Sequence, residues 1–279
     1  MIKQLELKAN EIRSSIIEML VEAGSGHSAG PLGMADVFTA LYFEILQIDP
    51  ARPDWPERDR LVLSCGHICP VLYATLAHRG FFARDELSTL RKLGSNLQGH
   101  PHSIGLPGVE TSSGPLGQGL SQAIGMSLAA NLRQEKWRIY AVLSDGEHNE
   151  GQTWEAIMLA GARQLHNLTA IVDRNNIQID GFTEDVMSLE PLADKYRSFG
   201  WHVLEVDGHN MSEILAALRH ARAVFEKPSV VICHTTPGKG VDFMEQDYKW
   251  HGVPPDRRQA QRALRELRSL RGKIVGGHE

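Results

Sequence analysis

The stretch IYAVLSDGEHNEGQTWEAIMLAGARQLHNLTAIVDRNNIQIDG, residues 139–181, decides the fold. It begins with an apolar run, continues through a segment whose apolar residues have helical spacing, and reaches a second apolar run at 168–172. Three similar runs lie elsewhere in the chain, at 61–63, 203–206 and 230–232. Short apolar runs separated by helices are typical of a parallel sheet covered on both faces. We therefore predict an α/β fold with a doubly wound, mostly parallel sheet.

Helical patterns account for much of the remaining chain. They span 5–21, 34–46, 70–78, 153–165 and 212–225, the last with Asn210 or Ser212 as its cap. Residues 256–273 carry six arginines, and leucines at 264, 267 and 270 form one apolar stripe. We interpret this segment as a solvated helix docked by its leucines and prefer that reading to a nucleic-acid contact.

No linker, repeat or low-complexity tract divides the sequence. We predict a single domain over residues 1–279, built from a helical N-terminal part (1–57), an α/β core (58–235) and a C-terminal loop with a basic helix (236–279).

Composition excludes several classes of protein. With 42% hydrophobic and 23% charged residues, the 279-residue chain resembles globular proteins, so disorder and mini-protein scaffolds are excluded. A net charge of −5 provides no basic field for nucleic acid or an anionic membrane. The uncharged stretch 111–132 is too polar for a membrane span. Three cysteines cannot form a disulfide framework and the N-terminus lacks a secretory signal, so we expect a cytoplasmic protein.

Polar residues follow two of the predicted strands. Asp145 and Gly146 come after the run at 139–143, and Asn175 comes after the run at 168–172. Because the carboxyl ends of parallel strands meet at one edge of a sheet, ligands bind there. Asp145 and Asn175 fit a half-filled magnesium coordination sphere, which a diphosphate would complete. Gly146 would let phosphate oxygens approach the backbone.

These residues and further motifs together resemble the transketolase family. The other matching segments, in the family's order, are Gly24-Ser25-Gly26-His27, Gly30-Pro31-Leu32-Gly33, Leu63-Ser64-Cys65-Gly66-His67, Gly99-His100-Pro101, Leu106-Pro107-Gly108-Val109-Glu110, Gly114-Pro115-Leu116-Gly117-Gln118-Gly119 and Trp250-His251-Gly252. The resemblance extends from near the start of the chain to residue 252. It implies a thiamine-diphosphate-dependent enzyme that transfers a two-carbon ketol group from a ketose to an aldose, with phosphorylated sugars expected.

The resemblance also implies a role for each matching residue. Magnesium, or another divalent cation such as Ca²⁺ or Mn²⁺, would bind Asp145, the Asn175 side chain and the Ile177 carbonyl. The residues that would bind thiamine diphosphate are His67, Gly114, Pro115, Leu116, Asp145, Gly146, Glu147, Asn175, Ile177 and His251. The catalytic histidines would be His27, His67, His100 and His251, with His100 touching a donor hydroxyl. Glu150 resembles a carboxylate at the family's subunit interface.

Histidine side chains also suit the proton transfers that ketol transfer requires. Ketol transfer moves protons to and from hydroxyl and carbonyl oxygens, which favours groups that titrate near neutral pH. Three of the four histidines follow a glycine, which would let the backbone turn tightly. The histidines that we interpret as turn residues are His102, His148, His209 and His234. Cys65, His67 and Cys69 suggest zinc only weakly, because no second ligand pair has the usual spacing, and we interpret both cysteines as packing residues.

The sequence departs from the family mainly in what it lacks. Transketolases carry a second, pyrimidine-binding domain whose glutamate activates the thiamine ring, and this chain stops before it. The resemblance therefore implies a partner, a C-terminal transketolase subunit, in an α2β2 assembly that includes self-association. Met1 and the polar tail 276–279 favour a separate subunit over a truncation. Two smaller departures are Ser144, where the motif commonly has glycine, and Pro237, where some relatives have lysine.

Three readings of the function remain open from the sequence. The first is the N-terminal subunit of a split transketolase, which the histidine set favours. The second is half of a related enzyme, such as 1-deoxyxylulose-5-phosphate synthase or a pathway-specialised transketolase. The third is a noncatalytic cofactor-binding or regulatory protein, although folding alone does not require Asp145, Asn175 and the histidines.

Overall fold

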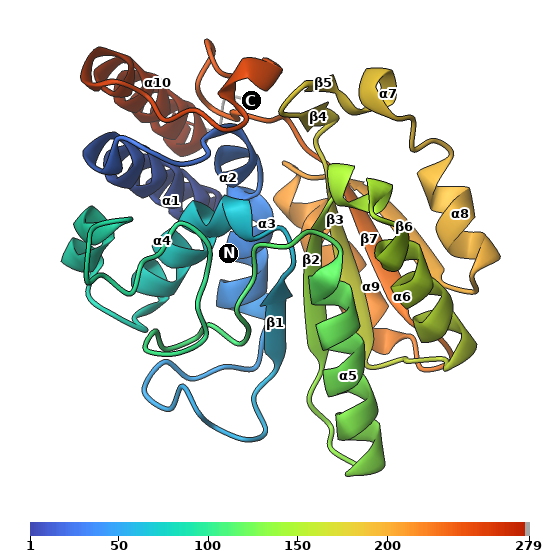
Figure 1. The fold of residues 1–279 in the computed structure, drawn as a ribbon. Helices are drawn as coiled ribbons and strands as arrows, with labels where there is room; N and C mark the ends of the chain where they lie inside the picture. The colour runs from blue at the N-terminus through green and yellow to red at the C-terminus, as the bar shows by residue number, and fades with distance from the viewer. Residues whose placement is uncertain (277–279) are drawn as a thin grey trace.

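The computed structural model describes residues 1–276, which form a central sheet with helices on both faces (Figure 1). The strands of this sheet are β1 (Arg60–Leu63), β2 (Ile139–Ser144), β3 (Leu168–Arg174), β6 (His202–Asp207) and β7 (Ser229–His234). They are hydrogen-bonded in the order β1-β2-β3-β7-β6, and every neighbouring pair is parallel. The five apolar runs are these five strands, so the predicted fold class is confirmed.

The apolar character of the strands follows from burial on both faces. In β2, Tyr140 and Val142 pack into one hydrophobic cluster, whereas Ile139, Ala141 and Leu143 pack into the other. Strands that are buried on both faces show continuous apolar runs, not alternation with polar residues.

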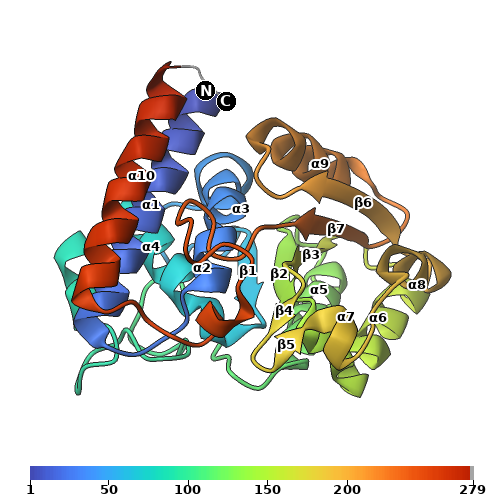
Figure 2. The same cartoon turned by 90° about the horizontal axis from the view of Figure 1, so that it is seen from above.

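Helices cover the two faces as separate layers (Figure 2). On one face lie α1 (Ile2–Ala23), α3 (Ala35–Ala40), α4 (Cys69–Arg79), α9 (Met211–Ala223) and α10 (Arg257–Gly276). On the other lie α5 (Gln118–Leu132), α6 (Gly151–Ala162) and α8 (Leu192–Ser198). Of the two predicted caps for α9, the structure uses Asn210, whose side chain accepts hydrogen bonds from the backbone N–H groups of Ser212 and Glu213.

Helices α1 and α10 lie side by side, with the described ends of the chain close together (Figure 2). Lys3 Nζ donates to the Val275 carbonyl over 2.6 Å. Leu267 is fully buried, while the arginines of α10 stay at the surface, so the prediction of a solvated helix docked by its leucines is confirmed. The predicted tail beyond residue 276 lies outside the described residues.

One predicted helix is divided in the structure. Instead of a continuous helix over 34–46, the chain forms α2 (Ala29–Gly33), then α3, then a π-helical turn at Leu41–Ile45. The Leu46 N–H donates to the Leu41 carbonyl, five residues back, which widens the last turn. Apolar spacing did not reveal these breaks because residues on both sides of them are buried.

Short elements complete the fold. They are the 3₁₀ turns Gly66–Ile68, Arg84–Thr89, Gly146–Asn149 and Tyr248–Trp250, the hairpin of β4 (Ile177–Gln178) and β5 (Gly181–Phe182), and α7 (Thr183–Val186). Among the helices of residues 1–276, none has the length and apolar character needed to cross a bilayer.

Candidate active site

A cavity of about 340 Å³ lies at the carboxyl edge of the sheet. Its lining residues are His27, His67, His100, Gly114, Leu116, Ser144, Asp145, Gly146, Asn175, Ile177, Gln178, Ile179, Asp180 and His251. The loops after β1, β2 and β3 meet here with segments from both ends of the chain. Of the predicted site residues, the structure brings all except Pro115 and Glu147 to this cavity.

Asp145 is held in place by several hydrogen bonds. It follows β2 and is 1% exposed. Its Oδ2 accepts from Arg174 Nη1 at 2.9 Å, from the Asn176 N–H at 2.7 Å and from the Thr183 hydroxyl at 3.3 Å, whereas within residues 1–276 its Oδ1 accepts only from the Gly146 N–H at 2.7 Å. Burial raises the pKa of Asp145, while the Arg174 guanidinium opposes that shift. Of the two carboxylate oxygens, Oδ1 therefore has more capacity left for a further partner.

Asn175 is oriented by a buried carboxylate. Its Nδ2 donates to Asp173 Oδ2 over 2.7 Å, which turns the amide oxygen Oδ1 toward the Ile177 N–H at 3.0 Å. Asp173 in turn accepts from the Thr235 hydroxyl. Burial, together with nearby Asp145, raises the pKa of Asp173 to about 7. Asp173 thus fixes which atom of the Asn175 amide can serve as an oxygen ligand.

Three of the predicted histidines form a compact cluster. The ring centroids of His27 and His67 are 5.0 Å apart, those of His67 and His251 5.2 Å, and those of His27 and His251 5.6 Å. The Nδ1 atoms of His27 and His251 are buried and have no hydrogen-bond partner among residues 1–276. Near His100, an ideal Cβ built on Gly114 would lie 3.7 Å from the His100 ring.

All four histidines have pKa values that favour the neutral ring. Burial is the first cause for each, and it lowers the pKa of His27 to about 4, with further contributions from His251 and Arg91. Burial lowers the pKa of His67 well below its usual range and also lowers those of His100 and His251. At neutral pH each neutral ring carries one nitrogen that can donate a proton and one that can accept.

Glu147 does not line the cavity. It is 0% exposed, and its Oε1 accepts from the Ser64 hydroxyl and from the Gly117 N–H at 2.7 Å, while Oε2 accepts from the Ser144 N–H at 3.2 Å. The Glu147 side chain is therefore turned away from the cavity, and a cofactor contact through the backbone amide of this residue stays a prediction. The carboxylate instead ties the ends of β1 and β2 to the glycine-rich loop.

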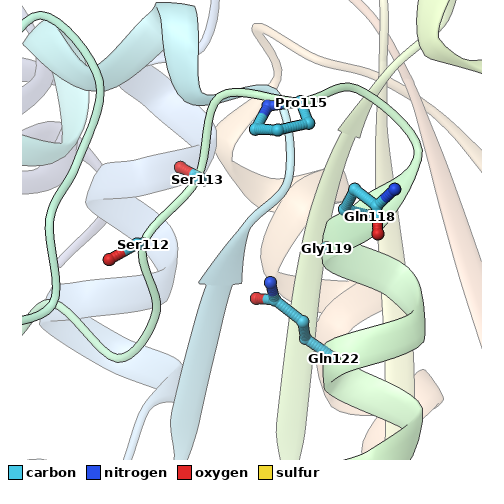
Figure 3. A pocket seen from close by; sticks show the side chains of 6 residues that line it. All are labelled: Ser112, Ser113, Pro115, Gln118, Gly119 and Gln122. Carbon is cyan, nitrogen blue, oxygen red and sulfur yellow. The ribbon is translucent and has the colours of Figure 1, made fainter.

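Pro115 lines a neighbouring hollow of about 290 Å³ (Figure 3). This hollow lies between the loop that carries Ser112 and Ser113 and the start of α5, where Gln122 extends toward the loop. The side chain of Pro115 thus faces away from the cavity that Gly114 and Leu116 line. Glu150 directly precedes α6 without a side-chain capping hydrogen bond, is exposed, and lies outside the cavity lining.

Several functional residues escaped the sequence reasoning. Arg174 hydrogen-bonds Asp145, and Asp173 hydrogen-bonds Asn175, so these two residues hold the predicted metal ligands in place. The sequence feature that could have pointed to them is their position next to Asn175 at the end of an apolar run. Buried Arg174 also pairs with Glu184 and Glu190. The lining residues that the sequence did not single out are Gln178, Ile179 and Asp180, whereas Ser144 was noted as a departure from the family's motif.

The zinc reading of Cys65, His67 and Cys69 finds no support. Both cysteines are buried and free, in agreement with their interpretation as packing residues. Within residues 1–276, no three side chains of His, Cys, Asp or Glu are grouped so as to hold a metal. A cation at Asp145 and Asn175 would therefore need amide, carbonyl and ligand oxygens to complete its coordination.

Comparison with known proteins adds an independent observation. The family described as "Transketolase, thiamine diphosphate binding domain" matches residues 5–268. The chain belongs to the transketolase family. It is 44% identical to the 6-deoxy-6-sulfo-D-fructose transketolase subunit of Clostridium sp. (strain MSTE9), over 94% of this chain and 96% of that protein. It is 42% identical to an apulose-4-phosphate transketolase subunit of Phocaeicola vulgatus, over 95% and 94% of the two chains.

Solved transketolases share this fold. The transketolase of Campylobacter jejuni superposes with a TM-score of 0.89 at 35% identity, over 96% of this chain but 42% of that one. The chain thus matches transketolase subunits over their length and spans less than half of a whole transketolase. It is the thiamine-diphosphate-binding part of a transketolase, a transferase, so the predicted family and cofactor are confirmed.

The residues present fit that cofactor. A carboxylate oxygen of Asp145 and an oriented amide oxygen of Asn175 are hard ligands of the kind that magnesium prefers, and both residues line the cavity. An ideal Cβ on Gly146 would lie 3.1 Å from the Gln178 side chain, so a larger residue would crowd the space where a diphosphate could reach the backbone. In the same cavity, Nδ1 of His27 and Nδ1 of His251, which have no partner within the described part of the chain, are free for polar groups of a ligand.

Proposed function

We propose that this chain is the N-terminal subunit of a two-subunit transketolase that transfers a two-carbon ketol group from a ketose to an aldose. The single observation that carries the proposal is that Asp145 and Asn175 line the same cavity as His27 and His251, whose Nδ1 atoms have no hydrogen-bond partner within residues 1–276. We also propose that residues 1–279 act as one domain, because α1 and α10 share one hydrophobic cluster.

In this proposal Asp145, Asn175 and the Ile177 carbonyl hold magnesium, and Gly146 with the neighbouring backbone holds the diphosphate. Bound thiamine diphosphate supplies the electron sink for the bond-breaking step. The contribution of this chain is to orient that group. Arg174 and Asp173 support the proposal because they fix the oxygen atoms of both ligands before anything binds.

The histidines are proposed to move protons. Since burial keeps them neutral at pH 7, each can take a proton from a sugar hydroxyl or give one to a carbonyl oxygen. Nδ1 of His27 and Nδ1 of His251 have no competing partner within residues 1–276. His100 is exposed, a position that suits contact with the incoming sugar.

A partner completes the proposed enzyme. It would carry the pyrimidine-binding domain and the catalytic glutamate, and two copies of each chain would form the assembly. The similar proteins named as transketolase subunits support this proposal, because they match over nearly their whole length. Buried, unpaired cysteines are consistent with the reducing, cytoplasmic compartment that we also propose.

We further propose that the substrate is a ketose that carries a tetrahedral oxyanion. One similar protein is named for a sulfonated ketose and another for a phosphorylated one. Both names describe ketol transfer, which supports the transketolase reading over a 1-deoxyxylulose-5-phosphate synthase.

The test is reconstitution. The purified chain is assayed for ketol transfer alone and with a candidate C-terminal subunit, in thiamine diphosphate and magnesium. We expect activity only in the mixture. Activity of the lone chain would contradict the two-subunit proposal. Cofactor binding without activity, in a mixture that forms the stable complex, would favour the noncatalytic reading.

A further inference from the structure

One histidine outside the cavity connects two segments that are far apart in the sequence. His209 lies in the turn after β6, with 12% of its side chain exposed. Its Nε2 is 2.7 Å from the backbone nitrogen of Thr236, and its Nδ1 is 2.9 Å from Asp36 Oδ2. A backbone N–H can only donate, so Nε2 of His209 is the acceptor and the ring proton is on Nδ1. His209 therefore donates to Asp36 and holds the backbone of Thr236.

The carboxylate that orients this ring is itself fixed by a buried ion pair. Arg13 Nη1 donates to Asp36 Oδ1 over 3.2 Å, and Arg13 Nη2 donates to Asp36 Oδ2. Arg13 is 3% exposed and Asp36 is 5% exposed. Burial alone would raise the pKa of Asp36, but the charge of Arg13 and the hydrogen bond from His209 lower it to about 2. Asp36 is therefore ionised at neutral pH and keeps the His209 ring in one orientation.

The segment that His209 holds reaches the metal-side residues. The Thr235 hydroxyl, one residue before Thr236, donates to Asp173 Oδ1. The other carboxylate oxygen of Asp173 accepts from the Asn175 amide over 2.7 Å. A continuous series of contacts thus leads from His209 to the side chain of a predicted magnesium ligand.

Close backbone packing restricts this segment further. An ideal Cβ on Gly208 would lie 2.5 Å from Thr235 Cγ2, so the residue before His209 has to be small for Thr235 to keep its place. An ideal Cβ on Gly33 would lie 3.0 Å from the Thr236 carbonyl oxygen. Because both neighbours approach so closely, a shift of Thr236 would also displace Thr235.

We propose that His209 is a positioning residue for the magnesium site and acts through Thr235. This inference rests on the proposed function. By holding the Thr236 N–H, the ring keeps the Thr235 hydroxyl against Asp173, and Asp173 keeps the Asn175 amide in one orientation. Groups behind the metal ligands fix ligand orientation in this way and so raise metal affinity. His209 is absent from the cavity lining, so its action is indirect.

The first test compares two amides of different length at this position. Magnesium is titrated into the chain with saturating thiamine diphosphate. The His209→Asn side chain can still donate to Asp36 but is too short to reach the Thr236 N–H, and we expect about tenfold weaker magnesium affinity. The longer side chain of His209→Gln can accept from that N–H and should restore most of the affinity. Equal affinities in the wild type and His209→Asn would overturn the proposal, as would equal losses in His209→Asn and His209→Gln.

The matched control is His234→Asn, at the end of β7. His234 directly precedes Thr235, but its ring is exposed and its Nε2 lies 3.3 Å from Glu205 Oε2. This variant should bind magnesium normally. A loss equal to that in His209→Asn would overturn the proposal, because it would show that any change near the end of β7 weakens the site.

A double-mutant cycle tests whether His209 acts through Thr235. Thr235→Val removes the hydroxyl that donates to Asp173 and should weaken magnesium binding about as much as His209→Asn. The double variant should bind magnesium no more weakly than the weaker single variant, because both changes break the same connection. Additive losses would overturn the proposed route. Unchanged affinity in Thr235→Val would overturn it as well, even if His209→Asn failed to fold.

Kinetics of the assembled two-subunit enzyme separate positioning from a general loss of structure. In His209→Asn the magnesium concentration that gives half the maximal rate should rise about tenfold, while kcat at saturating magnesium should stay within about threefold of the wild-type value. A fall in kcat that magnesium does not restore would overturn the positioning role. If the wild-type assembly showed no ketol transfer, the proposed function would be contradicted, and the magnesium affinities of the chain would still decide the role of His209.

Discussion

The two walls of the cavity are built in opposite ways. The metal-side wall, Asp145 with Asn175 and the residues that hold them, is a closed network in which each carboxylate and amide has a partner. The histidine wall comprises His27, His67, His100 and His251. The rings of His27, His67 and His251 pack against one another, and the buried Nδ1 atoms of His27 and His251 have no partner within residues 1–276. An unpaired buried polar atom costs about 1–3 kcal/mol, which a ligand hydrogen bond can offset.

This difference indicates that the walls serve different tasks. A metal ligand must hold one geometry, so its orientation is fixed by other residues before binding. A group that exchanges protons with a substrate needs a free nitrogen and a pKa that can be tuned by burial. Variants of the metal-side wall should therefore weaken cofactor binding, whereas variants of the histidine wall should slow the reaction.

Asp145→Ala should have the largest effect. It removes the carboxylate that we propose binds magnesium directly and leaves Arg174 as a buried cation without this partner. We expect the affinity for thiamine diphosphate in magnesium to fall by more than about 100-fold, measured by isothermal titration calorimetry on the chain. Asp185→Ala, an exposed aspartate of α7, is the control and should bind normally. Unchanged affinity in Asp145→Ala would refute the assignment of this wall.

His100→Asn should slow the reaction without weakening cofactor binding, which would distinguish the roles of the two walls. The exposed ring has no carboxylate partner within residues 1–276, so its loss should leave the metal-side wall intact. In the assembled enzyme kcat should fall about 100-fold, because a proton-transfer group is lost. Cofactor affinity should stay within about threefold of the wild-type value. A large loss of affinity would show that the division between the walls is wrong.

The metal-side wall was partly predictable and the histidine wall was not, for a physical reason. Asp145 and Asn175 follow two adjacent parallel strands, so local sequence and sheet geometry bring them together. The four histidines come from four separate segments, and no spacing rule relates them. Only the resemblance to a family grouped His27 with His251.

The sequence could not predict the direction in which individual side chains near the site point. Glu147 lies two residues from Asp145, yet the 3₁₀ turn at Gly146–Asn149 directs it into the protein interior. Arg174 is buried because three carboxylates surround it, and two of them come from the later segment 183–191. The central strands, by contrast, were predictable because burial on both faces gives them continuous apolar runs, such as 139–143 in β2.

Asp173→Asn should have a smaller effect on the same wall. The substituted amide can no longer accept from both Thr235 and Asn175 in the same way, so the Asn175 amide loses its fixed orientation. We expect about tenfold weaker magnesium affinity, measured by titrating magnesium into the chain with saturating thiamine diphosphate. Asp173 has no place on the histidine wall, so kcat at saturating magnesium should change little. A fall in kcat with normal magnesium affinity would contradict the proposed orienting role.

The smallest expected effect concerns Glu147, a buried carboxylate outside the cavity lining whose oxygens accept from Ser64, Gly117 and Ser144. Burial, and secondarily Glu150, raise its pKa to about 7 despite hydrogen bonds from Ser64, Gly117 and Ser144. Its pKa in the unfolded chain is near the ordinary 4.5. A raised folded pKa means that the stabilising contribution is complete below about pH 4.5 and is lost as the pH rises through 7. Between pH 6 and 8 the wild type should therefore lose about 1 kcal/mol of unfolding free energy that Glu147→Gln does not lose. Urea unfolding of both chains at each pH measures the difference, and parallel pH profiles would contradict a raised pKa at this carboxylate.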